Sequence, residues 1–259
     1  MLKDRLGGKP IHPVMLAVWL NFVDNGRHGC SKACVFCNFR NHPIRMCPTE
    51  EGLREYIRDY MSYSRRPSLL LSGGGDPLYE FEKNQEQVLM ILRICKELGI
   101  ATIMQSYELD TIDKYCETLF GDIERYYFSS EGEDERLLRL IKKLTALGKK
   151  VSITRVLNRT SDIQDLKLEE LDPWVAYYSM EGVTLHIREN YNHCYTDDEN
   201  EAIRRAIMER YIDNPSYRVH YRPHKNTLGR FIGLMNDEVL YGEDFISLRF
   251  LKPMAERDI

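Results

Sequence analysis

The stretch from Ser68 to Pro77 reads SLLLSGGGDP, an apolar run that ends in three glycines and an acid. An amphipathic stretch follows at Glu82–Leu98 and stops at Gly99, and a second short apolar run follows at Ala101–Gln105. Apolar residues at helical spacing between two short apolar runs indicate a strand, a helix and a strand. This order implies a right-handed crossover between parallel strands, so the segment predicts an α/β fold.

The same alternation extends along most of the chain. The expected strands are Val14–Val23, Ser68–Ser72, Ala101–Gln105, Ile123–Ser129, Lys150–Leu157 and Val183–Ile187, with a seventh at Tyr217–Tyr221. The expected helices are Glu50–Met61, Glu82–Leu98, Glu108–Phe120, Asp134–Leu147, Asp162–Leu171 and Asp198–Tyr211. Six strand–helix units are too few for a closed eight-fold barrel, which leaves a partly open barrel or a doubly wound sheet. We predict a partial (β/α)6 TIM-like barrel, a curved parallel sheet with outer helices, whose chemistry belongs at the carboxyl ends of the strands.

Length and charge narrow the class of protein. The 259 residues suit a single domain, with a core at about 14–215 and a C-terminal extension at 216–259 that closes the barrel. The net charge is -4 and no basic stripe is present, so we expect no nucleic-acid partner. The apolar segment Val14–Val23 is too short to span a bilayer, and no signal-peptide core precedes it. We therefore expect a cytoplasmic protein without a membrane partner.

Three of the seven cysteines, Cys30, Cys34 and Cys37, lie within eight residues and follow the first expected strand. In a reducing compartment such a cluster indicates metal rather than disulfides. The three positions also fit one stripe of a helix, but thiols framed by glycine, histidine and asparagine fill a core poorly. Structural zinc would need a fourth ligand, and no distant C-x2-C pair is present. An iron–sulfur cluster normally has four cysteine ligands, so three would leave one iron open to an external ligand.

The spacing C-x3-C-x2-C, with the aromatic Phe36 before the last cysteine, resembles the signature of the radical S-adenosylmethionine (SAM) superfamily. The resemblance implies an oxygen-sensitive enzyme with a [4Fe–4S] cluster held by Cys30, Cys34 and Cys37. It also implies that SAM binds the open iron through its amino and carboxylate groups, with Phe36 among the cofactor-binding residues. One electron then cleaves SAM and releases a 5′-deoxyadenosyl radical, which abstracts a hydrogen atom from a substrate.

The glycine run resembles a second motif of this superfamily. Residues 74–77 read GGDP, and the superfamily's G-G-E-P segment receives the methionyl amino group of SAM. The candidate cofactor-binding residues here are Gly73, Gly74, Gly75 and Asp76. Glycines allow a close backbone approach, and a carboxylate beside an ammonium forms a charge-assisted pair. Asp76 stands where the motif has glutamate. The run lacks the Walker and dinucleotide patterns, and a tight turn is the alternative interpretation.

Polar residues also follow the fourth and fifth expected strands. The resemblance implies that Ser129 and Glu131 reach the ribose or the sulfonium side of SAM, whereas helix capping by Ser130 or Asp134 explains this segment equally well. Arg155 is unusual in a parallel strand, because such strands are buried on both faces. The resemblance implies that its guanidinium meets the cofactor carboxylate.

The sixth strand is polar for a buried strand. Alternation places Thr184, His186 and Arg188 on one side, where they line either a substrate cavity or a solvated edge. Cys194 is a candidate hydrogen-atom donor, although an inert loop thiol is an equally simple interpretation. The substrate-binding candidates are Tyr107, His186, Arg188 and Tyr191, and the catalytic candidates are His193 and Cys194.

The remaining cysteines are scattered, so no second cluster is expected and a compact enzyme acting on a small molecule is indicated. We expect a lyase or salvage reaction on a modified nucleobase, as in queuine lyase, in which hydrogen abstraction weakens a neighbouring C–N or C–C bond. A flavodoxin or ferredoxin would supply the electron. One alternative is a glycyl-radical-enzyme activase, whose substrate is a partner protein. Another is a non-catalytic zinc-binding module, which would be colourless.

Overall fold

The computed structural model describes residues 15–18, 30–32, 46–47, 49–62, 67–72, 76–157, 167–189, 195–211, 218–222, 231–235, 238–241, 246–249 and 255–256. The chain divides into two compact units. The first unit comprises Met1–Glu124 and Leu228–Ile259, and the second comprises Arg125–Thr227. Among the described residues, no helix is both long enough and apolar enough to cross a membrane.

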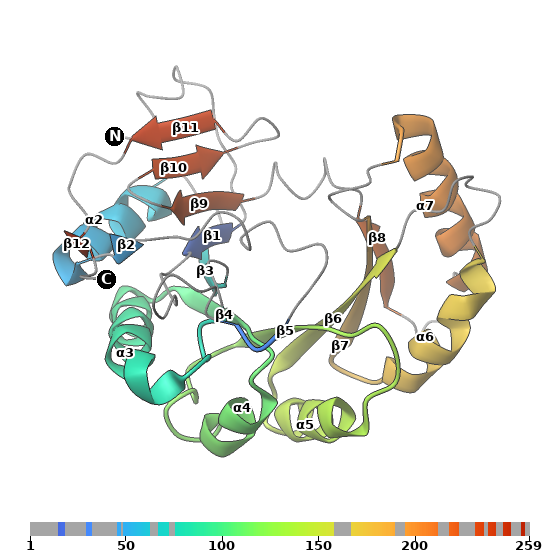
Figure 1. Cartoon of the computed structure of the whole chain (residues 1–259), viewed down its shortest axis with the longest axis horizontal. Coiled ribbons are helices and arrows are strands. Elements are labelled where there is room, and N and C mark those ends of the chain that lie inside the picture. The colour runs from blue at the N-terminus through green and yellow to red at the C-terminus, as the bar shows by residue number, and fades with distance from the viewer. Residues whose placement is uncertain are drawn as a thin grey trace. The chain divides into compact units, whose positions relative to one another are not determined.

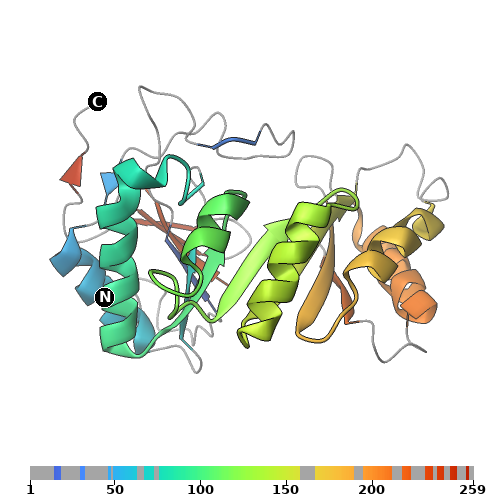
Figure 2. The same ribbon diagram turned by 90° about the horizontal axis from the view of Figure 1, so that it is seen from below.

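In the first unit a parallel sheet is extended by a C-terminal antiparallel hairpin. Its elements are β1 (Met15–Val18), β2 (Met46–Cys47), α2 (Glu50–Met61), β3 (Ser68–Leu71), α3 (Phe81–Leu98), β4 (Ala101–Gln105), α4 (Leu109–Tyr115), β9 (Phe231–Met235), β10 (Glu238–Tyr241), β11 (Ile246–Arg249) and β12 (Ala255–Glu256). The strand order is β11-β10-β9-β1-β3-β4, in which β9, β1, β3 and β4 run parallel. The strands β10 and β11 are antiparallel, and β2 pairs with β12. Figure 2 shows α3 lengthwise beside the strands of this unit.

The second unit is a parallel four-stranded sheet with helices between its strands. Its elements are β5 (Arg125–Ser129), α5 (Glu135–Ala146), β6 (Lys150–Leu157), the 3-10 helix η2 (Leu168–Leu171), α6 (Asp172–Tyr178), β7 (Val183–Glu189), α7 (Asp197–Tyr211) and β8 (Val219–Arg222). The order is β5-β6-β7-β8, and every pair is parallel. The helices α5, α6 and α7 lie along the outer side of β6, β7 and β8 (Figure 1).

Helix ends fall where the chain can satisfy their backbone groups. The carboxylate of Asp134 accepts hydrogen bonds from the amides of Arg136 and Leu137 and thereby caps the start of α5. Gly99 adopts a φ of 68° after α3, a left-handed conformation that glycine takes without strain. The amide of the next residue, Ile100, then bonds back to the carbonyl of Cys95 at 2.9 Å. These local signals explain why both helices have the predicted ends.

The core of the second unit lies between the sheet and its helices. The buried strand residues on the helix side include Tyr126, Phe128, Val151, Ile153, Val183, Leu185 and Ile187. The helices contribute Leu137, Leu140, Ile141, Leu144, Trp174, Val175, Tyr178, Ile203, Ile207 and Tyr211. Because successive strand residues point to opposite faces, the residues between them lie on the face away from the helices.

Most elements match the sequence prediction, and two parts of it need correction. The helix Glu50–Met61 and the strands Ala101–Gln105 and Lys150–Leu157 have the predicted bounds. The predicted helix Asp162–Leu171 is wrong in its described part, because α6 begins only at Asp172 after a 3-10 turn, with Pro173 in its first turn. Proline suits the start of a helix and breaks its interior. The strands β9, β10 and β11 were not predicted.

Two leucines three residues apart test this packing. Leu144 is fully buried, whereas Leu147 is 40% exposed. We expect Leu144→Ala to lower the free energy of unfolding by about 3 kcal/mol, because it leaves a cavity in the core. We expect Leu147→Ala to change it by about 0.5 kcal/mol or less. Urea unfolding of the full chain measures both, and equal effects would contradict the described packing of α5.

Candidate functional site

Asp76 joins the ends of two neighbouring strands. It follows β3 by a short loop and is 3% exposed. Its Oδ1 accepts hydrogen bonds from the Leu78 amide at 2.9 Å and from the Ser106 hydroxyl at 2.6 Å. Its Oδ2 accepts one from the Tyr107 amide at 2.6 Å. The Ser106 hydroxyl also accepts a hydrogen bond from the Glu108 amide at 3.0 Å. One carboxylate therefore fixes the loop after β3 against the segment after β4.

The protonation of Asp76 reflects two opposing effects. Burial raises the pKa of Asp76 to about 6, because an ionised carboxylate is poorly solvated there. The three hydrogen bonds lower the pKa and so limit this shift, while the nearby carboxylate of Glu108 raises it further. The group is therefore mostly ionised at pH 7 and takes up a proton as the pH falls through 6.

Lys32, within the cysteine motif, lies near Tyr107, one of the donors to this carboxylate. Cys30 is half-buried, and its Sγ accepts a hydrogen bond from the Lys32 amide at 3.4 Å. The Lys32 ammonium lies 5.5 Å from the centroid of the Tyr107 ring, within the range of a cation–π contact. Because the Tyr107 amide also binds Asp76, Lys32 of the cysteine motif and Asp76 of the GGDP motif contact the same residue just after β4. These are the two motifs in which the sequence predicts the cluster ligands and the residues that bind SAM.

Two further cysteines, Cys95 and Cys116, have environments unlike that of Cys30. Cys95 and Cys116 are buried in the core, and burial raises the pKa of Cys95 to about 12. A thiol with so high a pKa stays protonated, and metals bind the thiolate. Across the part of the chain that the structure describes, no group of three His, Cys, Asp or Glu side chains is placed to hold a metal. Two of the three predicted cluster ligands lie outside that part.

Nine predicted site residues lie outside the described residues, and their roles stay predictions. They are Cys34, Phe36, Cys37, Gly73, Gly74, Gly75, Tyr191, His193 and Cys194. The residues that flank 190–194 are described and are joined. The Glu189 carboxylate is buried and accepts hydrogen bonds from the Tyr195 amide and from Asn200 Nδ2. The Tyr221 hydroxyl donates to Asn200 Oδ1 at 2.6 Å, which ties β8 to this network.

The segment after β5 has a partly structural role. The prediction of capping is confirmed for Asp134 and is wrong for Ser130. The Ser130 hydroxyl instead donates to the Gly132 carbonyl at 2.6 Å and contacts the Tyr178 hydroxyl at 3.2 Å. Tyr178 in turn binds the Asp134 amide at 3.0 Å. These bonds hold the turn between β5 and α5 and leave the roles predicted for the strand end untested.

Glu131 and Arg155 influence each other within the second unit. Partial burial raises the pKa of Glu131, and the Arg155 guanidinium partly offsets this rise. Arg155 also donates from Nη1 to the Glu170 carbonyl at 3.4 Å. By alternation Arg155 shares the helix-facing side of β6 with Ile153, whereas Ser129 belongs to the opposite side of the sheet. The cofactor contacts predicted for these three residues stay predictions.

His186 is a buried polar residue in the middle of β7. It is 4% exposed, and its ring centroid lies 5.8 Å from that of His220 on β8. Burial, together with the nearby positive charge of Arg222 and the neighbouring ring of His220, lowers the pKa of His186 to about 2. The ring is therefore neutral at every physiological pH. Its Nδ1 is buried and has no hydrogen-bond partner among the described residues.

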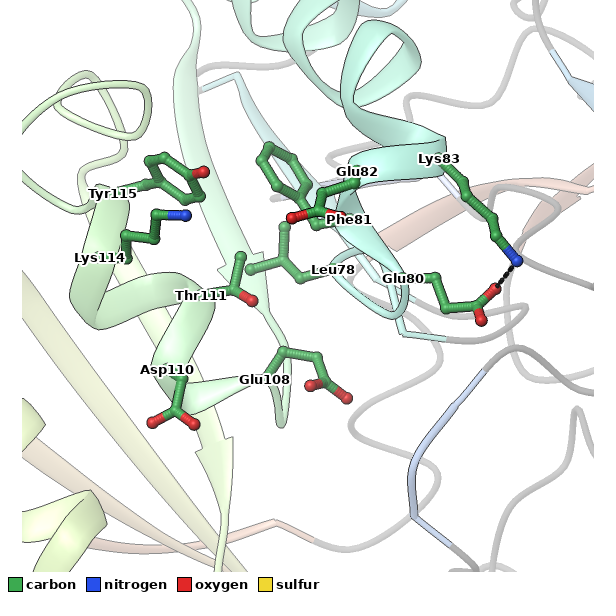
Figure 3. A pocket seen from close by; sticks show the side chains of 10 residues that line it. All are labelled: Leu78, Glu80, Phe81, Glu82, Lys83, Glu108, Asp110, Thr111, Lys114 and Tyr115. Atoms are coloured by element: carbon green, nitrogen blue, oxygen red, sulfur yellow. Dashed lines mark hydrogen bonds and ion pairs between the residues drawn. The ribbon is translucent and has the colours of Figure 1, made fainter.

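A separate cavity lies between the start of α3 and the helix α4. Its volume is about 360 Å³ (Figure 3). The lining residues are Leu78, Glu80, Phe81, Glu82, Lys83, Glu108, Asp110, Thr111, Lys114 and Tyr115. Lys83 forms an ion pair with Glu80 at 2.8 Å, and the Lys114 ammonium lies 4.8 Å from the centroid of the Tyr115 ring. No residue predicted for cofactor or substrate binding lines this cavity.

Comparison with known proteins shows that this fold has been seen before. No protein-family model matches the chain, and no curated protein matches it. Its fold is instead shared with a solved structure, that of Streptococcus suis SuiB bound to S-adenosylmethionine. The two structures align with a TM-score of 0.62 over 98% of this chain at 14% sequence identity, and this chain spans 64% of the length of SuiB. The predicted α/β fold of the partial (β/α)6 type is therefore confirmed, with β1, β3, β4, β5, β6 and β7 as its parallel strands.

Sequence reasoning missed several residues of the site. Ser106 and Lys32 were not predicted as site residues. Ser106 nevertheless contacts Asp76, and Lys32 contacts Tyr107, both of which were predicted. Ser106 directly follows β4, so the rule that chemistry collects at the carboxyl ends of parallel strands would have found it. Lys32 lies within the cysteine motif and has no distinguishing pattern of its own. Glu189 also ends its strand, and its burial at 2% exposure is visible only in the structure.

Removal of the Asp76 carboxylate is expected to destabilise the first unit. Asp76→Ala leaves three donors without their acceptor, and we expect the free energy of unfolding to fall by about 3 kcal/mol or more. Asp122 is the matched control, because its 57% exposed side chain makes a surface ion pair with Lys96. We expect Asp122→Ala to cost about 1 kcal/mol or less in the same urea titration. Equal losses would show that Asp76 does not join the two strands.

The raised pKa of Asp76 predicts a dependence of stability on pH. Its folded pKa of about 6 exceeds the ordinary value of 3.8, so the folded state binds the proton more tightly. That stabilisation is fully present below about pH 4 and is lost as the pH rises through 6. The Asp76→Asn variant has no carboxyl group at this position that could bind or release a proton. Between pH 4 and 7, we expect wild-type protein to lose up to ~3 kcal/mol of stability relative to this variant. Parallel pH profiles of the two proteins would contradict the raised pKa.

Proposed function

We propose that this chain is a radical SAM enzyme, in which a [4Fe–4S] cluster and S-adenosylmethionine act on a small organic substrate. The observation that carries the proposal is that one residue, Tyr107, contacts both sequence motifs. Lys32 of the cysteine motif lies on Tyr107, whose amide binds Asp76 of the GGDP motif. In a parallel α/β fold the carboxyl ends of the strands form the usual ligand site. Tyr107, which contacts one residue of each motif, lies just after such an end, that of β4.

The donor set fits a cluster of this kind. Cys30, Cys34 and Cys37 would hold it, and the cluster, when bound, supplies one electron that cleaves SAM. Cys30 is not in a disulfide and is half-buried, and its sulfur already accepts a backbone N–H from Lys32. Hydrogen bonds to cysteine sulfur stabilise the thiolate and tune the potential of iron–sulfur clusters. A thiol placed for packing would resemble Cys95, which is fully buried.

Asp76 and Ser72 have structural roles around this site. Asp76 positions the glycine run, because its two oxygens bind one donor within its own loop and two donors after β4. The Ser72 hydroxyl reinforces this link by donating to Gln105 Oε1 at 3.1 Å. With Asp76 occupied in this way, we infer that backbone groups of the glycine run meet the methionyl group of SAM. The shared fold with SuiB, which was solved with SAM bound, supports a SAM site in this fold.

The proposal extends to the substrate and to the electron donor. We propose a lyase or salvage reaction on a modified nucleobase, with a flavodoxin or ferredoxin as the electron donor. Support for a small polar substrate comes from the face of β7 that carries His186 and Arg188 and points away from the helices. A planar ring would stack on an aromatic side chain, and Tyr107 is the described candidate beside the cysteine loop.

The cysteine assignment is tested by metal content. After anaerobic reconstitution we expect about four iron and four sulfide per wild-type chain, and production of 5′-deoxyadenosine from SAM when a reductant is added. Cys30→Ala, Cys34→Ala and Cys37→Ala should each lose most of the iron and all of the cleavage, because each removes a ligand. Cys116→Ala is the control, since this buried thiol lies outside the motif, and it should retain both.

Two outcomes would contradict the proposal. A motif variant that keeps its full iron and sulfide would show that its cysteine is no ligand. Wild-type protein that binds one zinc per chain and remains colourless would indicate a structural zinc site instead. Thermal unfolding of every variant separates loss of the cluster from loss of the fold. The control and the motif variants make the same type of substitution, cysteine to alanine.

A further inference from the structure

The cavity between the start of α3 and the helix α4 is large enough for a small molecule. Its volume of about 360 Å³ falls within the range of about 300–1,000 Å³ that is usual for ligand sites. All of its lining residues belong to the first unit, and none of them was predicted to bind the cofactor or the substrate. The side chains of the cavity therefore have to indicate what it binds.

Part of the lining is apolar and aromatic. Leu78, Phe81 and Tyr115 supply it, and the ring centroids of Phe81 and Tyr115 lie 5.5 Å apart. The fully buried Phe120 packs against these two rings at centroid distances of 5.4 and 5.8 Å and so fixes their positions. Such a lining favours a ligand with an apolar body.

The rest of the lining is mostly charged, and carboxylates outnumber ammonium groups. The carboxylates come from the starts of α3 and α4, as Figure 3 shows, and belong to Glu80, Glu82, Glu108 and Asp110. The two ammonium groups of the lining contact other side chains. Lys83 forms an ion pair with Glu80 at 2.8 Å, and the Lys114 ammonium lies 4.8 Å from the centroid of the Tyr115 ring.

Glu108 supplies a separate indication that the ligand is a cation. Its side chain is half-buried, and its Oε1 is buried without a hydrogen-bond partner among the described residues. An unsatisfied buried polar atom is rare in native proteins. The charge of Glu108 also acts on Asp76, whose three hydrogen-bond donors are all neutral. Among the described side chains, neither carboxylate has an ion-pair partner, so a bound cation would offset their repulsion.

The lining distinguishes an organic cation from a metal ion. In the part of the chain that the structure describes, no three His, Cys, Asp or Glu side chains are placed to hold a metal. A metal ion would also make no use of the apolar lining. A protonated amine has three N–H donors and can form charge-assisted hydrogen bonds to the Glu108 carboxylate. The Thr111 hydroxyl of the lining can accept a further one.

We propose that this cavity binds a small organic cation, a primary ammonium compound with an apolar or aromatic body, through the Glu108 carboxylate. The inference goes beyond the proposed function and does not depend on it. The cavity is joined to the GGDP motif through Asp76. The Leu78 amide donates to Asp76, and the Glu108 amide donates to the Ser106 hydroxyl, which itself donates to Asp76. An occupant thus contacts two residues whose backbone this carboxylate holds.

Three probes of similar size test the charge of the ligand. They are the cation 2-phenylethylammonium, the neutral 2-phenylethanol and the anion phenylacetate, each added to the full-length protein purified without oxygen. Saturation-transfer NMR titrations at equal ionic strength measure the dissociation constants. We expect the amine to bind with a dissociation constant of about 1 mM or lower. The alcohol and the acid should bind at least about ten-fold more weakly, because neither offers a charged donor.

Charge variants then locate the binding. Glu108→Gln removes the charge and keeps the size, so we expect it to weaken amine binding at least about ten-fold and to abolish the preference for the amine over the alcohol. Glu108→Asp keeps the charge and should retain that preference. Glu124→Gln is the matched control, an exposed glutamate of the same unit outside the cavity, and should leave the binding unchanged.

A blocking variant tests the cavity itself. Thr111→Phe places a ring in the cavity from α4 and should abolish amine binding, whereas Thr118→Phe, at an exposed position outside the cavity, should leave it unchanged. Thermal unfolding shows which variants keep the fold. If Glu108→Gln does not fold, the probe series in wild-type protein and the pair of threonine variants decide.

Four results would overturn the proposal. They are the absence of saturable amine binding, equal binding of the amine and the alcohol, equal losses in Glu108→Gln and Glu124→Gln, and amine binding that survives Thr111→Phe. Because the titrations require neither the cluster nor SAM, their outcome is independent of the radical SAM assignment.

Discussion

The buried carboxylate of Asp76 is the interaction on which the arrangement of the first unit's candidate site depends. A charge removed from water is tolerated only when donors replace the lost hydration, and the three donors come from two separate segments. They reach it together only when β3 and β4 pair in the observed register, with Leu71 opposite Met104. The cysteine loop depends on the same bond, because Lys32 lies on Tyr107, whose amide is one of the donors.

In the second unit the main constraint is different: one face of its sheet is apolar and the other is polar. Leu185 and Ile187 stabilise the unit by packing on its helices, while His186 and Arg188 alternate with them and contribute no comparable apolar burial. The Glu189 network with Tyr195 and Asn200 then fixes the carboxyl end of β7 to α7. Stability therefore comes from the helix-facing side, which allows polar residues on the opposite side.

The sequence predicted those features that depend on local chemistry. Ala101–Gln105 and Lys150–Leu157 are short apolar runs bounded by clear breaks, so their bounds were found. The role of Ser106 depends on a bond to Asp76, thirty residues away, and no local pattern encodes that pairing. The strands β9, β10 and β11 follow one another too closely in the sequence for helices to alternate with them, so the pattern that revealed the other strands gave no signal. The pairing of Arg222 with Arg188 required the register of β8, which only the structure supplies.

The aspartate in the GGDP motif, where the superfamily motif has glutamate, follows from the same geometry. Asp76 closes a turn onto the Leu78 amide, two residues ahead, and aspartate side chains are short enough to form such turns. An ionised carboxylate offers about four acceptor positions, and three of them are occupied here. The carboxylate is thus directed into the protein rather than outward. The departure from glutamate therefore matches a structural role for Asp76, which joins its own turn to the segment after β4.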